Sequence, residues 1–182
     1  MKFETFEIDG PVICKPNIIK DNRGFFAEVF RKDLLENFTK QKLKFCQINK
    51  SVSKMGILRG LHFQVYPYAQ TKLVSVTNGE IIDIIIDIRR NSKTFGKGMN
   101  LILNDKNNLQ LLVPKGFAHG FLVVSNSATV IYQVDNYYNP SYEYGINALD
   151  PKLNIDLNFK NIIRSNRDIN FPKLENIANY KF

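Results

Sequence analysis

The sequence predicts an all-β domain, a sandwich or barrel with a few short helices. Its apolar runs are short, rich in Val, Ile, Phe and Tyr, and separated by turn residues, which is the pattern of β-strands. Successive strands joined by short polar turns favour a sandwich or barrel over a parallel sheet with crossover helices. A chain of 182 residues without an internal linker or repeat fits one domain. We therefore expect a single domain over residues 1–182, with an irregular tail from about residue 151.

Three pairs of strands are predicted from the turns between them. Asn78-Gly79 is a dipeptide favoured in tight hairpins, because both positions tolerate positive φ. Residues 104–108 and 125–127 are polar turns as well. The strands beside these turns cover residues 72–77 and 81–88, 100–103 and 109–113, and 117–124 and 129–134.

Three segments depart from this strand pattern. The triplet Ile84-Ile85-Ile86 has no polar alternation, so we expect a second sheet to cover one face and a partner subunit the other. A helix is expected near residues 32–38, where apolar side chains recur at helical spacing. The tail beyond Pro151 mixes Asn, Lys and Ile, which indicates irregular or weakly helical cover.

The excess of basic residues indicates an anionic partner. The chain has 25 Lys and Arg against 17 Asp and Glu, a formal net charge of +8. A nucleic acid and a small anionic ligand both fit this charge. The cations are scattered, with no dense run and no basic helix, so we expect no nucleic-acid partner.

The sequence gives no sign of export or membrane binding. It has no apolar run of about 18 residues that would span a bilayer. Glu4 and Glu7 lie where a signal peptide would need its apolar centre. Cys14 and Cys46 form neither a CxxC pair nor a disulfide framework. We therefore expect a cytoplasmic protein and assign no chemistry to the cysteines.

The two histidines are the strongest candidates for chemistry. His62 lies among strand-like apolar residues, three positions after Arg59. Histidine takes and returns protons near neutral pH, and an arginine nearby suits an anionic substrate. His119 follows a turn at Pro114 and Gly116, where a strand of a small barrel would begin and point inward. Each histidine also has a structural explanation, as a hydrogen-bonded core side chain or as a tie between turn and backbone.

Other strands carry more polar groups than a strand needs. Gln47 and Asn49 flank Ile48, so both amides face the same side. Lys72 begins a predicted strand and Tyr132 lies in the middle of another. Structural explanations exist here too, since amides pair with loops and a strand tyrosine is usually a core aromatic with a satisfied hydroxyl. Their number in such short strands favours a functional site.

Five segments occur in an order that matches a known family. They are Asp21-Asn22-Arg23-Gly24-Phe25-Phe26, Gln47-Ile48-Asn49-Lys50-Ser51, Leu58-Arg59-Gly60-Leu61-His62-Phe63-Gln64, Lys72-Leu73-Val74 and Pro114-Lys115-Gly116-Phe117-Ala118-His119-Gly120-Phe121. They resemble the dTDP-4-dehydrorhamnose 3,5-epimerase family, whose members are cupin-type jelly-roll enzymes. The likeness runs from about residue 21 to residue 168. It implies a cupin-type jelly roll for this chain.

The resemblance also implies roles for particular residues. The catalytic base of the family falls on His62, the aspartate that orients it on Asp168, and the acid on Tyr132. Substrate-contacting positions fall on Arg23, Glu28, Gln47, Asn49, Arg59, Lys72, His119, Tyr138, Glu143 and Arg167. In the family, the region of Arg23 and Glu28 reaches the nucleotide bound by the neighbouring subunit, so a homodimer is implied.

The implied reaction is inversion at C3 and C5 of a dTDP-linked 4-keto-6-deoxy sugar, in rhamnose-type biosynthesis. The C4 ketone makes the hydrogens on C3 and C5 removable, because the charge moves onto oxygen as an enolate. A single base returns the proton only to the face it came from, so inversion needs a second group such as Tyr132. No nicotinamide is required and the chain has no glycine-rich phosphate loop. We expect no cofactor.

Three alternatives stay open. A related enzyme of the same fold would invert C3 only or act as a 3,4-ketoisomerase, and a non-catalytic module would bind the sugar nucleotide without turnover. A metal-dependent cupin is the third, because the Pro114-to-His119 pattern is shared with metal-binding cupins. Here, however, Phe63 and Gln64 follow His62 where those cupins supply a second histidine, which leaves a metal short of ligands. We therefore expect no metal site.

Overall fold

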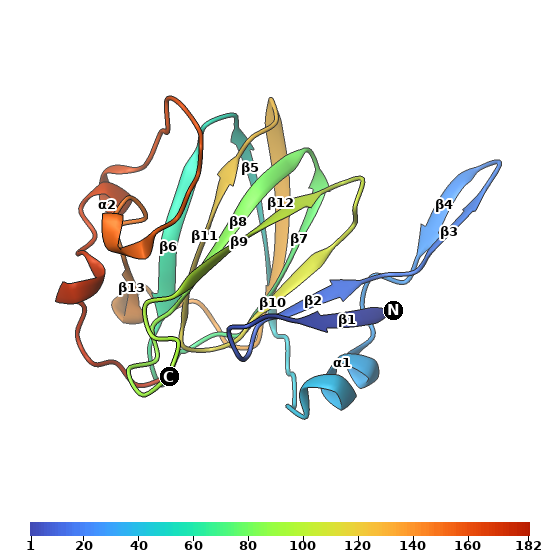
Figure 1. Ribbon diagram of the computed structural model, residues 1–182. Coiled ribbons are helices and arrows are strands. Elements are labelled where there is room, and N and C mark those ends of the chain that lie inside the picture. The colour runs from blue at the N-terminus through green and yellow to red at the C-terminus, as the bar shows by residue number, and fades with distance from the viewer.

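Two antiparallel sheets face each other in the computed structural model, which describes residues 1–182 (Figure 1). The six-stranded sheet has the order β1 (Lys2–Thr5), β2 (Val12–Lys15), β10 (Gln110–Val113), β7 (Lys72–Asn78), β12 (Ser127–Val134) and β5 (Gln47–Lys54). The five-stranded sheet has the order β13 (Glu143–Gly145), β6 (Leu58–Gln64), β11 (Phe117–Val123), β8 (Glu80–Asp87) and β9 (Gly98–Asn104). The predicted all-β sandwich is confirmed.

Short helices and one small hairpin complete the chain. The helices are α1 (Lys32–Thr39) and α2 (Asn166–Ile169), with 3₁₀ turns η1 (Pro140–Tyr142), η2 (Pro151–Leu153) and η3 (Leu174–Asn176). The helix expected near residues 32–38 is therefore confirmed, and its Leu35 is buried. No helix is long and apolar enough to cross a membrane.

The hairpin prediction at Asn78-Gly79 is wrong. β7 pairs with β10 and β12, whereas β8 pairs with β9 and β11. Gly79 has φ of 78° and lets the chain cross from one sheet to the other. The strands beside the other two predicted turns, β9 and β10, and β11 and β12, also lie in different sheets. These crossings produce a jelly roll, because each reversal moves the chain between layers instead of extending one sheet.

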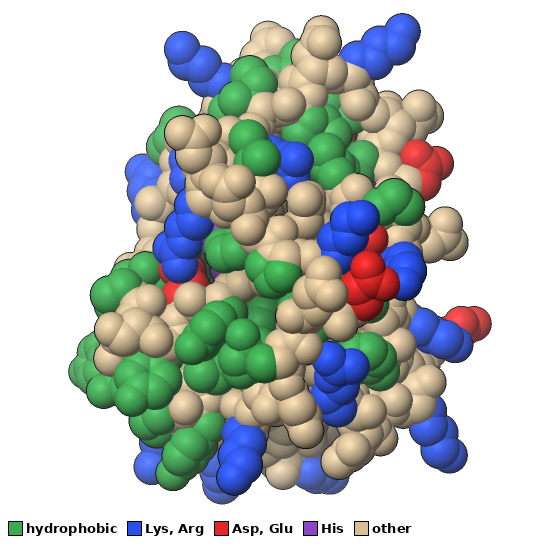
Figure 2. Space-filling model, turned by 90° about the vertical axis from the view of Figure 1, so that its left-hand side faces the viewer, with side chains coloured by type: hydrophobic (Ala, Val, Ile, Leu, Met, Phe, Trp, Pro, Cys, Tyr) green, Lys and Arg blue, Asp and Glu red, His purple; other side chains and the backbone are tan.

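The isoleucine triplet in β8 is covered on both faces by the chain itself. Ile85 belongs to the core between the two sheets. Ile84 and Ile86 point to the opposite face, where they pack with residues of the C-terminal segment such as Leu153 and Leu174. The expected burial and the role of the tail as cover are confirmed, but the expected partner subunit on this face is wrong. The tail carries enough apolar side chains to cover this face of the sheet. Figure 2 shows the surface of the molecule on the side of the tail, where the Lys and Arg side chains are spread apart.

The hairpin of β3 (Ile18–Asp21) and β4 (Gly24–Ala27), here called the arm, stands away from the sandwich (Figure 1). It pairs only with itself. Its apolar side chains lie in the open, with Phe25 57% and Phe26 68% exposed. The arm therefore presents aromatic side chains on a projecting element, outside the core of the sandwich.

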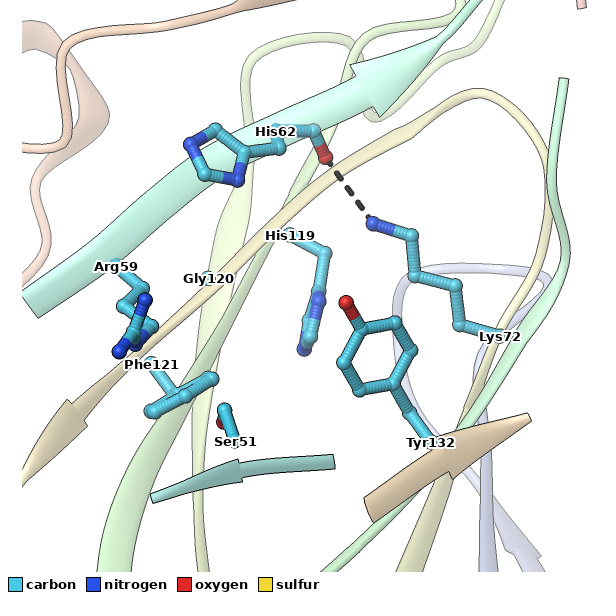
Figure 3. Close-up of a pocket in the computed structure, with 8 residues that line it drawn as sticks. All are labelled: Ser51, Arg59, His62, Lys72, His119, Gly120, Phe121 and Tyr132. Atoms are coloured by element: carbon cyan, nitrogen blue, oxygen red, sulfur yellow. Dashed lines mark hydrogen bonds between the residues drawn. The ribbon is translucent and has the colours of Figure 1, made fainter. Parts of the chain in front are cut away.

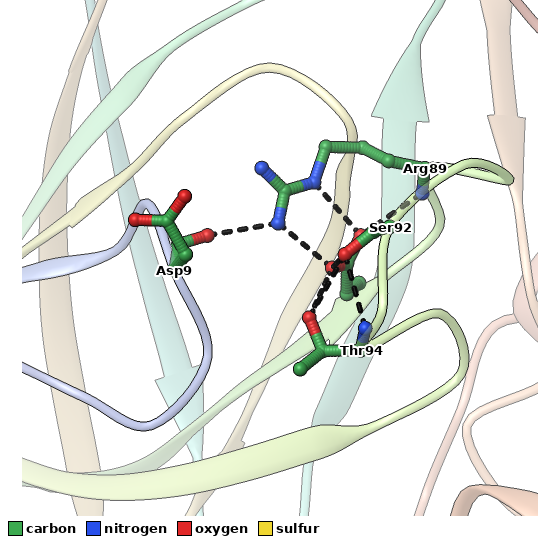
Figure 4. Close-up of polar contacts among 5 residues, drawn as sticks. Asp9, Arg89, Ser92 and Thr94 are labelled. Carbon is green, nitrogen blue, oxygen red and sulfur yellow. Dashed lines mark hydrogen bonds and ion pairs between the residues drawn. The ribbon is translucent and has the colours of Figure 1, made fainter.

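A buried carboxylate anchors the loop between β8 and β9 (Figure 4). Asp87 accepts hydrogen bonds from Arg89 Nε at 2.9 Å, Ser92 Oγ at 2.6 Å and Thr94 Oγ1 at 2.7 Å. Arg89 also donates to the backbone oxygen of Asp9 at 2.8 Å, which ties the loop to the β1–β2 turn. Burial alone would raise the pKa of Asp87, but these donors outweigh it and hold the pKa below the usual value.

Candidate active site

A cavity of about 170 Å³ lies between the two sheets and is lined by five of the thirteen side chains that the sequence singles out (Figure 3). Pockets that enclose a whole drug-sized ligand are usually about 300–1,000 Å³, so this cavity has room for part of a large substrate. It is lined by Ser51, Arg59, His62, Lys72, His119, Gly120, Phe121 and Tyr132.

An irregularity in β6 brings Arg59 and His62 into the same cavity. In a regular strand, residues three apart point to opposite faces. Here β6 advances three residues from Arg59 to His62 while its partner β11 advances two, from Phe121 to His119. The extra residue is a β-bulge, a device that re-aims side chains next to active sites. Gly60 has φ of 109° and the two backbones are so close that a side chain at Gly120 would meet the Arg59 carbonyl.

His62 is held by a buried aspartate. Its Nε2 lies 2.6 Å from Asp168 Oδ1, and the backbone N–H of Gly60 donates to Oδ2 at 3.3 Å. Burial would raise the pKa of Asp168, but the interaction with His62, the backbone N–H of Gly60 and the side chain of Ser165 outweigh it and lower the pKa. An ionised carboxylate only accepts hydrogen bonds, so Nε2 carries a proton, and in the neutral imidazole Nδ1 then has the lone pair. That second ring nitrogen faces the cavity in Figure 3.

Asp168 lies in the short helix α2, and the start of this helix fixes its position. Ser165 Oγ accepts from the Asp168 backbone N–H at 3.1 Å, as an N-cap residue does at the start of α2. Phe171 packs edge-on against the His62 ring, with 5.5 Å between ring centroids. The C-terminal segment therefore fixes the orientation of an imidazole that β6 supplies.

Tyr132 enters the cavity from the other sheet. It lies on β12, between Asn49 of β5 and Val74 of β7. Its hydroxyl points into the cavity (Figure 3). Burial and the nearby negative charge of Glu143 raise the pKa of Tyr132 above its usual value. The phenol consequently stays protonated at neutral pH and is able to donate a proton.

Lys72 and His119 are two further basic side chains that line this cavity. Lys72 Nζ donates to the backbone oxygen of His62 at 3.5 Å, and burial lowers the pKa of Lys72 to about 8 although Glu143 and Asp83 oppose the shift. His119 is the cross-strand neighbour of His62. Its Nε2 lies 3.0 Å from an oxygen of the fully buried Asp83. The cavity thus contains two aspartate-bound imidazoles on neighbouring strands of one sheet and a lysine from the facing sheet.

A polar network connects five other predicted residues near the cavity. Gln47 Nε2 donates to Asn49 Oδ1 at 2.8 Å, and Gln47 Oε1 accepts from the Tyr138 backbone at 3.1 Å. Tyr138 Oη donates to Glu143 Oε2 at 2.9 Å, and Arg167 pairs with the same carboxylate at 2.5 Å. A second cavity, of about 450 Å³, is lined by Arg59, His62 and Arg167 among others. The network and this cavity extend the site beyond the first cavity.

Arg23 and Glu28 lie apart from the cavity within this chain. Arg23, at the tip of the arm, is 86% exposed and paired with Asp21. Glu28 follows β4 and lies 3.6 Å from Arg31. Neither residue lines either cavity. The fold therefore brings eleven of the thirteen predicted site residues to one region, and leaves these two on the arm.

Sequence reasoning did not select three residues that the structure places at the site. Ser51 and Phe121 line the cavity, and Asp83 binds His119. The alternation of Gln47, Asn49 and Ser51 along one strand was a usable signal, because residues two apart share a face. No group of three or more His, Cys, Asp or Glu side chains is arranged to hold a metal ion.

The fold and site together define an acid–base enzyme on a cupin-type jelly roll. The chain matches the family model described as dTDP-4-dehydrorhamnose 3,5-epimerase over residues 5–176. It is 43% identical over 167 residues to an enzyme of that name from Shigella flexneri, with 92% of each chain covered. The chain belongs to the dTDP-4-dehydrorhamnose 3,5-epimerase family, and it is an isomerase.

Solved structures agree with this assignment. The crystal structure of dTDP-4-dehydrorhamnose 3,5-epimerase from Elizabethkingia anophelis superposes with a TM-score of 0.94 at 39% identity, with 99% of each chain covered. A 3,5-epimerase from Legionella pneumophila, in complex with dTDP-4-keto-L-rhamnose, has a TM-score of 0.93 at 40% identity and covers 97% of this chain and 94% of its own. A 3'-monoepimerase from Streptomyces bikiniensis is also similar, at 30% identity.

Proposed function

We propose that this chain inverts C3 and C5 of a dTDP-linked 4-keto-6-deoxy sugar, with His62 as the base and Tyr132 as the acid. The relatives at 38–45% identity carry the name of the 3,5-epimerase of rhamnose biosynthesis, and the solved Legionella relative holds a dTDP-4-keto sugar. The observation that carries the proposal is that an imidazole and a phenol enter one cavity from opposite sheets. Inversion at carbon needs groups so placed.

In the proposed mechanism, Nδ1 of His62 removes the proton next to the C4 ketone. Asp168 keeps the proton on Nε2 and stabilises the imidazolium that forms, as aspartates do in other His–Asp pairs. The electron pair moves onto the C4 oxygen as an enolate, near which Lys72 supplies a fixed positive charge. Tyr132 then delivers a proton to the opposite face of the same carbon. Each positioned proton-transfer group contributes about 10²–10⁴-fold in rate.

The remaining residues bind the nucleotide and sugar in this proposal. Arg59 uses its Nε to donate to Ser53 at 2.9 Å, which leaves its terminal nitrogens for a diphosphate. His119 faces the sugar from beside His62. The other contacts are assigned to Gln47, Asn49, Tyr138, Glu143 and Arg167. No cofactor takes part in these steps.

We also propose a homodimer in which the arm completes the neighbouring site. Arg23 and Glu28 are distant from the cavity of their own chain, and the arm that carries them exposes Phe25 and Phe26. A second copy of the chain would cover these side chains and receive Arg23 and Glu28 near its bound nucleotide. A single domain over residues 1–182 and a cytoplasmic location stay predictions.

The proposal is tested by proton NMR of a dTDP-4-keto-6-deoxy sugar incubated with the protein in D₂O. Solvent deuterium should enter at both C3 and C5, and both centres should invert. Exchange at C3 alone would identify a 3-monoepimerase, and movement of the keto group from C4 to C3 a ketoisomerase. Tight binding of dTDP without any deuterium incorporation would identify a binding module. A metal-dependent enzyme would lose turnover on treatment with a chelator.

A further inference from the structure

The inner face of β5 is a continuous row of polar side chains. Gln47, Asn49, Ser51 and Ser53 occupy alternate positions and point into the sandwich, where a sheet normally places apolar side chains. The residues between them point outward, so that Ile48 is 67% and Val52 63% exposed. A strand with its polar face inward is built to line a site.

Ser51 is the member of this row whose side chain has no partner. Gln47 and Asn49 bond each other, and Ser53 accepts from Arg59 Nε. The hydroxyl oxygen of Ser51 is buried and has no hydrogen-bond partner in the chain. Burying such a group without a partner costs about 1–3 kcal/mol, and each case in a native structure calls for an explanation.

Ser51 lines the reaction cavity itself. It shares this cavity with His62, Lys72, Tyr132 and Arg59, and Figure 3 shows it near Phe121 at one side of the cavity. All of these neighbours except Phe121 present charged or polar groups. The unused hydroxyl therefore borders the space in which the substrate reacts, and it is able both to donate and to accept a hydrogen bond.

We propose that Ser51 is a substrate-binding residue, whose hydroxyl donates to an oxygen of the bound sugar nucleotide. The inference rests on the proposed function, because it takes the occupant of the cavity to be that substrate. The acceptor is an oxygen of the sugar ring or of the diphosphate. The hydrogen bond would be weaker to the neutral sugar oxygen than to the anionic diphosphate oxygen.

The test compares Ser51→Ala with Ser75→Ala. Ser75 lies in the same sheet outside the reaction cavity, where its hydroxyl donates to the Ile131 carbonyl. Binding of dTDP alone and of dTDP-4-keto-L-rhamnose is measured by calorimetry, and turnover and thermal unfolding are measured for each variant. Ser51→Ala should weaken binding of the sugar nucleotide while Ser75→Ala leaves it unchanged. The Tm of Ser51→Ala should not fall, because the variant loses a hydroxyl that has no partner.

The size and pattern of the loss identify the acceptor. If the affinity falls about two- to tenfold for the sugar nucleotide but not for dTDP, Ser51 binds the sugar. If the affinity falls more than about tenfold for both the sugar nucleotide and dTDP, Ser51 binds the diphosphate. Unchanged binding and unchanged KM and kcat would overturn the inference. Ser51→Cys, which nearly keeps the volume but donates weakly, gives the same comparison if the alanine variant does not fold.

Failure of this inference is distinguishable from failure of the proposed function. If the wild-type protein epimerises the substrate and Ser51→Ala does so with the same kinetic constants, the inference alone is wrong. If the wild-type protein shows no turnover, the proposed reaction is wrong, whereas the dTDP measurement still reports on Ser51.

Discussion

His62 and Tyr132 reach one cavity from opposite sheets of the sandwich, the imidazole from β6 and the phenol from β12. The bulge in β6 turns His62 inward, and Asp168 holds the ring by its Nε2. A planar enolate between these two groups would have the base on one side and the acid on the other. Retention and inversion then depend on which group returns the proton.

Replacing His62 by alanine should abolish deuterium exchange at C3 and C5, with a loss of at least about 10²-fold in kcat. The variant lacks the proposed base, while Arg59 and the network around Glu143 remain. Binding of dTDP, measured by calorimetry, should therefore stay close to that of the wild type. Turnover by His62→Ala at the wild-type rate would show that another group removes the proton.

The change Tyr132→Phe separates proton removal from inversion. The variant keeps the aromatic ring and its packing but lacks the proton that the raised pKa of Tyr132 preserves. His62 would still exchange the substrate hydrogen with solvent on its own face. We expect deuterium in recovered, uninverted substrate and a product yield reduced by about 10²-fold or more. An unchanged ratio of product to exchanged substrate in the NMR spectrum would reject the role of Tyr132.

Lys72 should set the alkaline limb of the pH–rate profile. Its pKa in the folded chain is about 8, below the ordinary 10.5, because burial disfavours the charged form. The cation that supports the enolate is consequently lost as pH rises through about 8. The same shift means that the unfolded chain binds more protons between pH 8 and 10.5, so this group's contribution to stability rises over that range.

The measurement is kcat/KM from pH 6 to 10 for the wild type and for Lys72→Arg. The wild-type value should fall above pH about 8, whereas arginine keeps its charge throughout and should remove that limb. If Lys72→Arg retains activity together with the same limb, another group titrates there.

The strands were predictable from sequence, but their partners were not. Apolar runs and turn residues located β7 through β12, because side-chain alternation and turn chemistry are local properties. Asn78-Gly79 specifies a reversal of the chain without specifying whether the next strand pairs with the last or crosses to the facing sheet. The crossing is decided by which arrangement buries more apolar surface, and that depends on strands distant in sequence. The same limit applies to the cover over Ile84 and Ile86, which the C-terminal tail supplies.

The site was predictable mainly through the ordered motifs. Spacing alone would have put Arg59 and His62 on opposite faces of a regular strand, since the bulge at Gly60 is set by the contact of β6 with β11. Asp168 lies more than 100 residues after His62 and meets it only through the packing of the tail. Ser51 lies in one of the five ordered segments, but the sequence gives it no role beyond its alternation with Asn49, because an unpartnered hydroxyl is visible only in three dimensions.

Asp87 should be a major contributor to stability outside the site. Asp87→Ala would leave Arg89, Ser92 and Thr94 without their common acceptor, and breaking a buried ion pair costs about 3–5 kcal/mol. Asp9→Ala is the matched control, because it removes a nearby carboxylate but keeps the backbone oxygen that accepts from Arg89. Urea unfolding at pH 7 should show the loss for Asp87→Ala only. A free energy of unfolding equal to that of the control would contradict this assignment.

The pH dependence of that difference follows from the lowered pKa of Asp87. A carboxylate whose pKa is lower in the folded than in the unfolded chain stabilises the fold above the unfolded value, here 3.8, and loses that effect as pH falls through the folded pKa. The gap in unfolding free energy between wild type and Asp87→Ala should thus be constant near neutrality and narrow below pH 3.8.

Mixing two inactive variants should restore activity if the arm completes the neighbouring site. Arg23→Ala lacks the arm contact but has a complete cavity, whereas His62→Ala has a normal arm and no base. In a heterodimer, the cavity of the Arg23→Ala subunit receives Arg23 from its partner, so one of the two sites is intact. When equal amounts of the two variants exchange subunits at random, half of the dimers contain one subunit of each variant. Each of these mixed dimers has one intact site out of two, so the mixture should show about a quarter of wild-type activity. Activity no higher than the sum of the separate variants, in a preparation shown by mass spectrometry to contain mixed dimers, would mean that Arg23 serves its own chain or none.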